Sequence, residues 1–353
     1  MAQARESMTS ESAGTIAALA AAGLFGLGTP YAKQLLAATH PLLLSGLLYL
    51  GAGSALTIAR TRRADAETPL RREDRGMLLA VIAFGGVFGP LLMLVGLHRV
   101  SGVVGALLLN LEAPLTMLLA VALFGEHLGR RAAVAAALIL LGAVLLTARG
   151  AAGSADAWGA AAIAAACACW ALDNNLTQRL SLRDPIAIGR AKTLAAGACS
   201  VVAAVTLGAR LPTLPVVCGA LLLGSVSYGA SVVLAIVAMR RIGAARQAAY
   251  FATAPFVGAL AALPVLGERL GAHEVAAIVP LVAGVALLVR ERHAHRHVHE
   301  TMEHEHGHVH DEHHRHAHAA DDPPGEPHAH RHRHDPLIHA HAHSSDLHHR
   351  HRH

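Results

Sequence analysis

The chain has 353 residues, of which 54% are hydrophobic and 15% charged, and its formal net charge is +5. A soluble domain of this length would carry far more charged and aromatic residues than this alanine-, leucine-, valine- and glycine-rich sequence. Apolar runs such as residues 78–97 and 100–124 reach the roughly 20 residues that cross a bilayer. The composition therefore predicts a polytopic protein of the lipid bilayer, and no interleaving of basic with aromatic residues indicates nucleic-acid binding.

The apolar runs predict an all-α integral membrane fold of ten transmembrane helices. A stretch after Arg5 resembles a signal sequence but continues without a convincing cleavage site, so we interpret it as an uncleaved first helix after a short N-terminus, residues 1–13. In chain order the ten predicted helices cover residues 14–38, 41–60, 76–97, 101–124, 132–148, 157–179, 186–208, 215–239, 244–266 and 273–290.

The basic residues of the loops predict the orientation of these helices. The longest connection, residues 60–75, is rich in arginine, and the later loops on its side also carry more arginines than those on the opposite side. Because arginine-rich loops stay in the cytoplasm, we expect both termini to be cytoplasmic. The expected location is the bacterial inner (plasma) membrane. The arginines of this side are Arg60, Arg62, Arg63, Arg71, Arg72, Arg75, Arg130, Arg131, Arg179, Arg183, Arg240, Arg241 and Arg246.

The chain also repeats itself. LLLNLEAPLTMLLAVALFGEHLG (residues 107–129) aligns with AYFATAPFVGALAALPVLGERLG (residues 249–271), with Ala-Pro and Gly-Glu pairs recurring at separations of 141 and 142 residues. A weaker match aligns residues 25–41 with 169–185. The repeat unit contains five helices, and an odd number of crossings makes the second copy enter the membrane from the opposite side. Residues 14–148 and 157–290 are thus predicted to form a 5+5 inverted-topology repeat, typical of secondary transporters.

The NLEAPLT and LFGEHLGRR motifs, the echo YFATAPFVGAL…LGERL and the DNNLT segment resemble the EamA branch of the drug/metabolite transporter superfamily, over residues 14–290. The resemblance implies ten helices, alternating access, and transport of small metabolites such as amino acids or drugs. Members of that family generally lack a long histidine tail. We expect no enzymatic activity and no required cofactor, since no nucleophile elbow, phosphate loop or ordered metal motif occurs within the apolar spans.

Ionisable and polar residues inside the spans are the candidates for a substrate or coupling site. Glu112, which follows Asn110, lies midway along the fourth predicted helix. Burying it ionised without a partner would cost several kcal/mol, so we expect it to be paired, protonated or in a wet cavity. It either binds protons or an amine-bearing substrate, or it makes a structural hydrogen bond between helices.

A second set of candidates lies on the sixth and seventh predicted helices. Asp173 and the start of the seventh helix lie at similar depth, so Asp173 is expected to pair with Lys192 or Arg190. That pair is either a structural clamp or inner gate, or it contacts substrate; Arg190 could instead extend to the interface. Asn174, beside Asp173, adds hydrogen-bonding groups that do not suit a lipid-facing surface.

The remaining candidates are on the first, eighth and ninth predicted helices. Lys33 follows Gly26, Gly28 and Pro30, and either reaches the outer headgroups or serves as a cavity amine for a substrate carboxylate or Glu112. Tyr228, Gln247 and Tyr250 are plausible lining residues, because they offer hydrogen bonds without a charge. Glu126 and Glu268 lie at helix ends, where we interpret them as loop residues.

Residues 291–353 form a different segment, with 23 of the 27 histidines of the chain. Neutral imidazole binds zinc, nickel, cobalt and copper, so this tail is expected to bind divalent metal. Interleaved Glu, Asp, Arg, Gly and Pro, as in DDPPGEP (residues 321–327), predict a disordered cytosolic tail. The predicted metal ligands are His293, His295, His297, His299, His304, His306, His308, His310, His328, His330, His332 and His334.

Together these features favour a secondary active transporter that exports a small polar metabolite, an amino acid or a drug-like molecule, and carries a metal-binding regulatory tail. The alternative is an exporter of nickel, cobalt or zinc that is fed by the tail. A third hypothesis is a membrane-anchored metal store. The predicted charges within the spans favour the first hypothesis, because Lys33, Arg190 and Lys192 outnumber the two carboxylates, whereas a divalent-metal pathway would show an excess of carboxylates, histidines or thiols.

Overall fold

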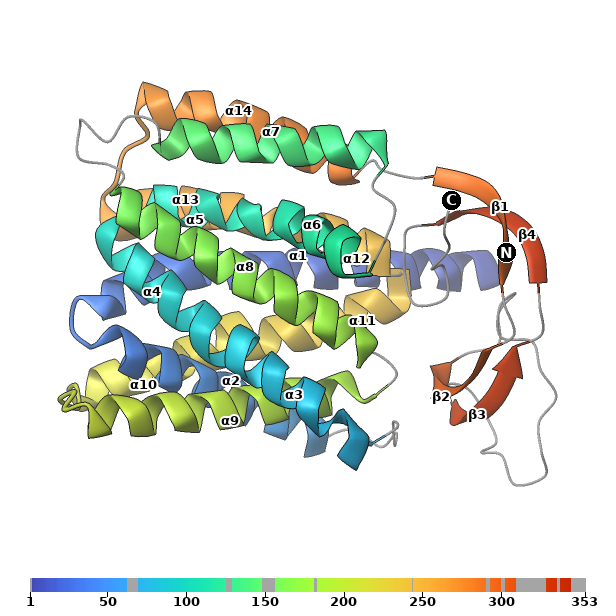
Figure 1. The fold of residues 1–353 in the computed structure, drawn as a ribbon, viewed down its shortest axis with the longest axis horizontal. Helices are drawn as coiled ribbons and strands as arrows, with labels where there is room; N and C mark the ends of the chain where they lie inside the picture. Colours follow the sequence, from blue (N-terminus) through green and yellow to red (C-terminus); the bar gives the residue numbers. More distant parts are fainter. Residues whose placement is uncertain are drawn as a thin grey trace.

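The computed structural model describes residues 2–61, 69–124, 129–147, 156–180, 183–242 and 244–289, and four tail segments, 293–299, 302–308, 328–334 and 337–343. Up to residue 289 the described regular secondary structure is all helical, and the helices form one bundle (Figure 1). Seven of its helical segments are long and apolar enough to cross a membrane, and two shorter apolar helices cover Ala254–Leu266 and Ala272–Leu288. The structure thus agrees with an all-α integral membrane fold up to that residue.

The first half of the bundle begins with α1 (Ala2–Leu36) and α2 (Pro41–Thr61). A continuous helical stretch follows, made of the 3₁₀ turn η1 (Arg72–Asp74), α3 (Arg75–Val81), the π-helical η2 (Ile82–Phe88) and α4 (Gly89–Arg99). Next come α5 (Gly102–Leu108), the 3₁₀ turn η3 (Leu109–Leu111), α6 (Glu112–Phe124) and α7 (Arg130–Thr147).

The second half contains α8 (Ala157–Arg179), α9 (Pro185–Thr206) and α10 (Leu214–Leu223), followed by the π-helical η5 (Gly224–Ala230) and α11 (Ser231–Ile242). The bundle ends with α12 (Ala244–Phe251), α13 (Ala254–Leu266) and α14 (Ala272–Val289). Pro185 occupies the first turn of α9, and Asp184 caps that helix by accepting hydrogen bonds from the amides of Ile186 (2.9 Å) and Ala187 (3.1 Å).

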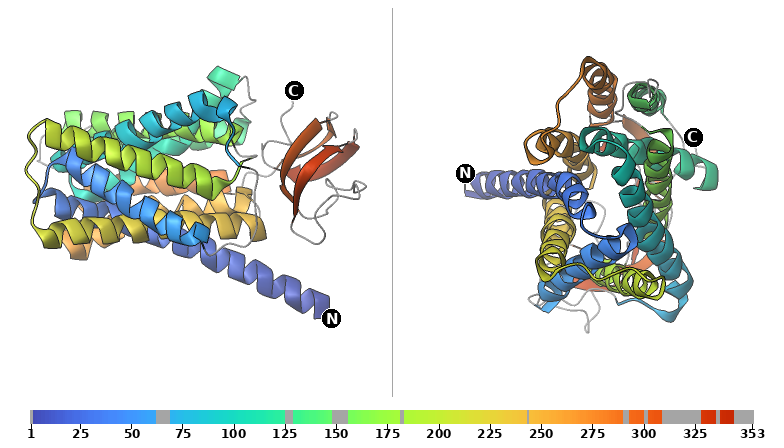
Figure 2. Two further views of the ribbon diagram at one scale, coloured as in Figure 1. Left: turned by 90° about the horizontal axis from the view of Figure 1, so that it is seen from below. Right: turned by 90° about the vertical axis from the view of Figure 1, so that its left-hand side faces the viewer.

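One predicted boundary is wrong by more than a turn. The first helix was expected to begin at residue 14, whereas α1 begins at Ala2, and its first turns extend beyond the other helices (Figure 2). Residues 2–13 lack proline and glycine and contain the helix-favouring residues Ala, Gln, Arg, Glu and Met, so nothing in them ends the helix.

The two halves carry the same irregularities at matching positions. The π-helical segments η2 and η5 are each seven residues long and lie 142 residues apart. The 3₁₀ turn η3 similarly corresponds to the break at residues 252–253 between α12 and α13. A π turn replaces i→i−4 hydrogen bonds by i→i−5 bonds and leaves a carbonyl without its usual partner. In both halves, therefore, a backbone acceptor becomes available at the same place.

The connections of the bundle gather at two ends. We name as the distal end the one with the connections 36–41, 99–102, 206–214 and 266–272, and as the proximal end the opposite one, where α1 begins and α14 ends (Figure 1). At the distal end the whole segment Gly102–Leu111 is buried. In Figure 2 the long axes of most helices run from one end to the other.

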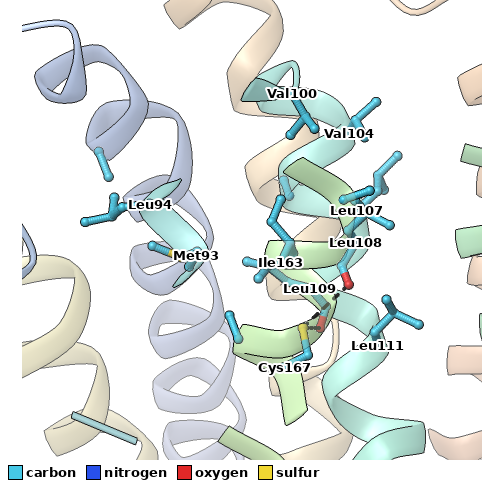
Figure 3. Close-up of a cluster of buried hydrophobic side chains, with 14 of the residues drawn as sticks. Met93, Leu94, Val100, Val104, Leu107, Leu108, Leu109, Leu111, Ile163 and Cys167 are labelled. Carbon is cyan, nitrogen blue, oxygen red and sulfur yellow. Dashed lines mark hydrogen bonds between the residues drawn. The ribbon is translucent and has the colours of Figure 1, made fainter. Parts of the chain in front are cut away.

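Helix pairs are held by close contacts rather than by the transfer of apolar side chains out of water. In a bilayer, lipid tails are as apolar as leucine, so small residues that let backbones approach favour association. α2 crosses α9 where Gly46 and Gly197 face each other, and a Cβ added to either would lie 3.0 Å from the carbonyl oxygen of the other. The buried leucines of α4 and α5, together with Ile163 and Cys167 of α8, form the core shown in Figure 3.

The tail was predicted to be disordered, and the structure describes four of its segments as β-strands. β1 (His293–His299) pairs with β4 (Leu337–His343), and β2 (Met302–His308) pairs with β3 (His328–His334), both antiparallel. The His-x-His alternation has the period of two that a strand needs. In the second sheet the register pairs Glu303 with Arg333 and Glu305 with Arg331.

Candidate functional site

The site is built around the carbonyl group of Gly85 in η2. Tyr49 of α2 donates its hydroxyl hydrogen to this oxygen over 2.9 Å, and the Trp170 indole Nε1 of α8 donates over 3.2 Å. Both side chains are buried. Since the π turn frees a carbonyl there, two helices can anchor on the backbone of a third. In the second half the matching oxygen, that of Ser227, accepts from the Ser231 hydroxyl over 2.6 Å.

An ion pair lies beside this anchor. Lys192 of α9 donates to the carboxylate of Asp173 on α8, and the Thr177 hydroxyl donates to the other Asp173 oxygen over 3.2 Å. The side chains of Asp173 and Lys192 are only 5% and 19% exposed. Two buried charges persist in such surroundings only when they are paired and hydrogen-bonded. Of the two partners expected for Asp173, Lys192 forms the ion pair. Arg190, which is half-buried on α9, forms no ion pair with the described residues.

Asp173 also explains why position 85 is a glycine. A Cβ added to Gly85 would collide with the Asp173 carboxylate, and one added to Gly86 would lie 2.6 Å from the Cβ of Ala196. The absence of side chains lets η2 approach α8 and α9 closely enough for their polar groups to meet the freed carbonyl. The local geometry of η2 and the ion pair are therefore parts of one arrangement.

Glu112 lies at the first residue of α6, directly after the 3₁₀ turn η3. The Asn174 side-chain amide of α8 donates to Glu112 Oε1 over 2.7 Å. Glu112 is half-buried and lies within electrostatic range of Asp173 and Lys192. Lys192 pairs with Asp173 and not with Glu112. The described partner of the Glu112 carboxylate is instead the neutral amide of Asn174. The cluster thus keeps one carboxylate that has no cation bonded to it among the described residues.

The η3 turn that precedes Glu112 is itself bound by α8. The Cys167 thiol contacts the carbonyl oxygens of Leu108 and Leu109 at 3.8 and 4.0 Å, as the dashed lines in Figure 3 show. The Asn110 side chain is buried and donates to the Leu107 carbonyl over 2.9 Å, a contact within its own segment. Asn110 therefore shapes the turn beneath Glu112, and its amide is directed to the backbone.

Aromatic side chains from both halves of the chain complete the cluster. The ring of Tyr228 in η5 lies 6.2 Å from the ring of Tyr49 and 5.6 Å from that of Phe25 on α1, the latter edge-on. Phe25 in turn lies 5.2 Å from Phe251. Such offset and edge-to-face pairs are the favoured aromatic arrangements. Tyr49 links this aromatic group to Gly85, so polar and aromatic side chains from both halves belong to one cluster.

Three predicted site residues lie elsewhere. Lys33 was expected to reach the headgroups or the cavity, but its ammonium group donates to the carbonyl oxygens of Leu97 (2.7 Å) and Val100 (2.5 Å). Tyr250 packs against the small cluster of α1 and α11 that contains Ala18 and Ala238. Gln247 is buried on α12. Among the described residues, none of the three forms a hydrogen bond or ion pair with Glu112 or Asp173.

Sequence reasoning also missed residues of the site. Tyr49, Trp170 and Phe25 were not singled out, although a tyrosine inside the second apolar run and a tryptophan three residues before Asp173 were available signals. Glu268 was interpreted as a loop residue, but its two carboxylate oxygens accept from the amides of Gly102 (2.6 Å) and Val103 (2.8 Å), which begin α5. The recurrence of the Gly-Glu pair in both halves could have pointed to it. Glu126, the equivalent residue, lies outside the described residues.

Metal ligation was predicted for the tail. Eleven of the twelve predicted ligands lie in β1, β2 and β3, and His310 lies outside the described residues. Among the residues whose side chains the structure describes, no group of three or more His, Cys, Asp or Glu side chains could hold a metal ion. The candidate site of the bundle is therefore formed by one ion pair, one further carboxylate, amides and aromatic rings.

Comparisons with known proteins identify the family and the fold of the chain. The chain is 29% identical over 296 residues to a protein of Methanothermobacter thermautotrophicus named as an uncharacterized transporter, an alignment that covers 78% of this chain and 85% of that protein. A protein of known crystal structure shares the fold with a TM-score of 0.57 at 21% identity, over 78% of this chain and 96% of that one. The model of the EamA-like transporter family matches the chain twice, at residues 12–148 and 157–290. The chain therefore belongs to the EamA-like transporter family and is a membrane transporter.

Proposed function

We propose that this transporter is a secondary active exporter of a small polar metabolite or drug-like molecule, and that it binds its substrate at Glu112. The observation that carries this proposal is the contact between Glu112 and Asn174 beside the Asp173–Lys192 pair and the Tyr49–Tyr228 rings. Ionisable residues are rare inside membrane spans and usually mark a substrate or ion route. This set of groups, drawn from both halves, is the best candidate for such a route.

Transport by alternating access requires two halves that rearrange around a shared site. We infer ten membrane crossings in a 5+5 inverted repeat, with the helical stretches 72–99, 102–124, 214–242 and 244–266 each counting as one crossing. The equal spacing of η2 and η5, and the double match of the family model, support this inference. In inverted repeats the site lies near the midplane between the halves, beside discontinuous helices. The interrupted stretches that contain Gly85 and Glu112 fit that expectation.

The chemistry of the site favours an amine. Glu112 offers a carboxylate whose described partner is an amide, so a proton or an ammonium group can bind it, whereas Asp173 is occupied by Lys192. The rings of Tyr49, Tyr228 and Phe25 give an apolar wall that also attracts cations. A substrate with an amine and an aromatic or apolar body would meet both parts. If a proton and the substrate compete for Glu112, proton entry drives substrate export.

Unequal packing at the two ends indicates the side from which the site is reached. At the distal end α5 packs against α13 and α1. At the proximal end α6 packs against α7 and α8, and α12 against α1, α11 and α14; in the described residues there is no comparable packing of α6 against α12. We infer that the site opens to the proximal end. With both termini in the cytoplasm, as the arginine distribution indicates, that end is cytoplasmic and faces a substrate to be exported.

The tail is proposed to be a metal-binding regulator. In both sheets the register sets histidines directly opposite each other: His295 faces His341 and His306 faces His330. Imidazole is a common ligand of divalent metals, so histidines paired in the register support this proposal. Zinc titration of the full chain, followed by calorimetry, is expected to show tight binding that the double variant His295→Ala, His341→Ala weakens. Retention of every site in a chain that ends at Val289 would contradict the proposal.

Resistance assays test the function as a whole. Cells that express the full chain, or a chain ending at Val289, are challenged with a panel of amino acids, amine drugs, nickel, cobalt and zinc. We expect resistance to one or more amine-bearing compounds from both chains, and none from the full-length variant Glu112→Gln. Metal resistance that disappears with the tail, without any metabolite resistance, would instead support a metal exporter and overturn the proposal.

A further inference from the structure

The connection between α4 and α5 at the distal end is held from both sides by charged residues. Lys33 of α1 donates to the carbonyl oxygens of Leu97 and Val100, where α4 ends. Glu268, which follows α13, accepts from the amides of Gly102 and Val103, where α5 begins. The ends of helices carry unsatisfied backbone groups, positive at the start and negative at the end. Each charge therefore meets a helix end of the opposite sign.

Glu268 is not needed merely to cap the start of α5. Ser101 already caps α5 locally, because its hydroxyl oxygen accepts from the Val104 amide over 3.1 Å. Glu268 comes from the other half of the chain, 166 residues away from Gly102, and uses both oxygens. At the same end Glu274 caps its own segment by accepting from the Gly271 amide over 2.9 Å. Of these two carboxylates, Glu268 is the one that connects the two halves of the chain.

The surfaces around these contacts close the distal end. α5 is buried along its whole length and packs against α13, where a Cβ added to Gly258 would lie 3.1 Å from the Cβ of Ala106. A transporter that releases substrate at this end must separate α5 from α13. The amides of Gly102 and Val103 would then lose Glu268, and the end of α4 would move relative to α1.

We propose that Lys33 and Glu268 form an electrostatic latch that keeps the distal end closed and that opens when substrate is released there. This inference rests on the proposed alternating-access function. It assigns to Lys33 a positioning role through the backbone of α4, and to Glu268 a role beyond loop geometry. Because both contacts are charge-assisted hydrogen bonds, weakening either one shifts the equilibrium toward the state that is open at the distal end.

The latch is tested by measuring the exposure of α5 to the distal side. All native cysteines are replaced by alanine and a reporter, Ala106→Cys, is introduced in the full chain in proteoliposomes. A membrane-impermeant maleimide is added on the distal side. When closure is faster than labelling, the labelling rate follows the population of the open state. Glu268→Gln and Lys33→Met are each expected to raise this rate by about tenfold, which corresponds to about 1.4 kcal/mol.

Two controls separate a latch from general loosening. Glu274→Gln makes the same chemical change at the same end without touching the contact between the halves, and is expected to leave the rate within about twofold. A second reporter, Ala238→Cys, is buried near the proximal end and is expected to stay unlabelled in every variant. If Glu268→Gln does not reach the membrane, Lys33→Met carries the test.

An unchanged Ala106→Cys rate in the latch variants, or an equal rise at Ala238→Cys, would overturn the proposal. The labelling needs no substrate, so its result is independent of the transport assay. Faster labelling in vesicles that never transport any compound of the panel would count against the proposed function and leave the latch in place.

Discussion

The buried ion pair of Asp173 and Lys192 gives the sharpest energetic prediction. Lys192→Met keeps the length of the side chain and removes its charge, so the Asp173 carboxylate loses its partner. The exposed fractions of 5% and 19% leave little solvent to replace it. Removing one member of a buried ion pair destabilises proteins by about 3–5 kcal/mol, because the other charge remains uncompensated. We expect a loss at the lower end of this range, since the Thr177 hydroxyl still donates to Asp173.

Reversible unfolding in mixed micelles, with Lys192→Met, Asp173→Asn and the double variant, measures this prediction. The double variant is expected to be more stable than Lys192→Met alone, because it leaves no charge unpaired. Arg190→Met is the matched control on the same helix, and is expected to change the free energy of unfolding by less than about 1 kcal/mol. A loss of less than 1 kcal/mol in Lys192→Met, or no recovery in the double variant, would refute the reasoning.

Three further predictions concern the surroundings of the site. Tyr49→Phe removes one of the two donors to the Gly85 carbonyl and should cost about 1 kcal/mol of unfolding free energy, whereas no loss would mean that Trp170 alone satisfies this oxygen. Gly46→Leu should prevent α2 from packing against α9 and abolish the peak of folded protein in size-exclusion chromatography. Gly23→Ala is the control and should be neutral, because a Cβ at Gly23 would meet nothing within 4 Å. Equal yields of the two variants would contradict the packing account. Hydrogen bonds from the Trp158 amide and from Arg99 lower the pKa of the Asp156 carboxyl below its ordinary value of 3.8. The ionised carboxylate therefore stabilises the folded protein at pH values above 3.8. This contribution is lost as the pH falls through the lower pKa of the folded state. Asp156→Asn should therefore flatten the acid limb of a stability–pH curve, and an unchanged limb would argue against this contribution.

Much of the helical layout could be predicted from the sequence, because apolar length alone sets where a chain crosses a bilayer. The predicted helix 157–179 is α8 with the same bounds, and the helix predicted for 132–148 is α7, Arg130–Thr147. The pairing of Asp173 was also predicted, since depth in the membrane follows from residue count. The local irregularities could not be predicted. The sequence IAFGGVF of η2 does not indicate that this segment is π-helical rather than α-helical.

The partners of the charged residues were harder to predict than their depth. Lys33 and Glu268 bind backbone groups 64 to 166 residues away, and a sequence does not show which helix end lies beside them. Helices that are apolar on most sides give no amphipathic signal for the face that meets a neighbour. Tyr49 was missed because its acceptor, the Gly85 carbonyl, is available only where η2 is π-helical.

The central claim is that substrate binds at Glu112 between the two halves. Proteoliposomes that contain the wild-type chain, Glu112→Gln or Glu274→Gln are loaded with the amine found in the resistance screen, and its movement is followed with and without an imposed proton gradient. We expect gradient-dependent transport by the wild-type chain and by Glu274→Gln, and at least about a hundredfold slower transport by folded Glu112→Gln, equivalent to about 2.7 kcal/mol. Full proton-driven transport by Glu112→Gln would contradict the account.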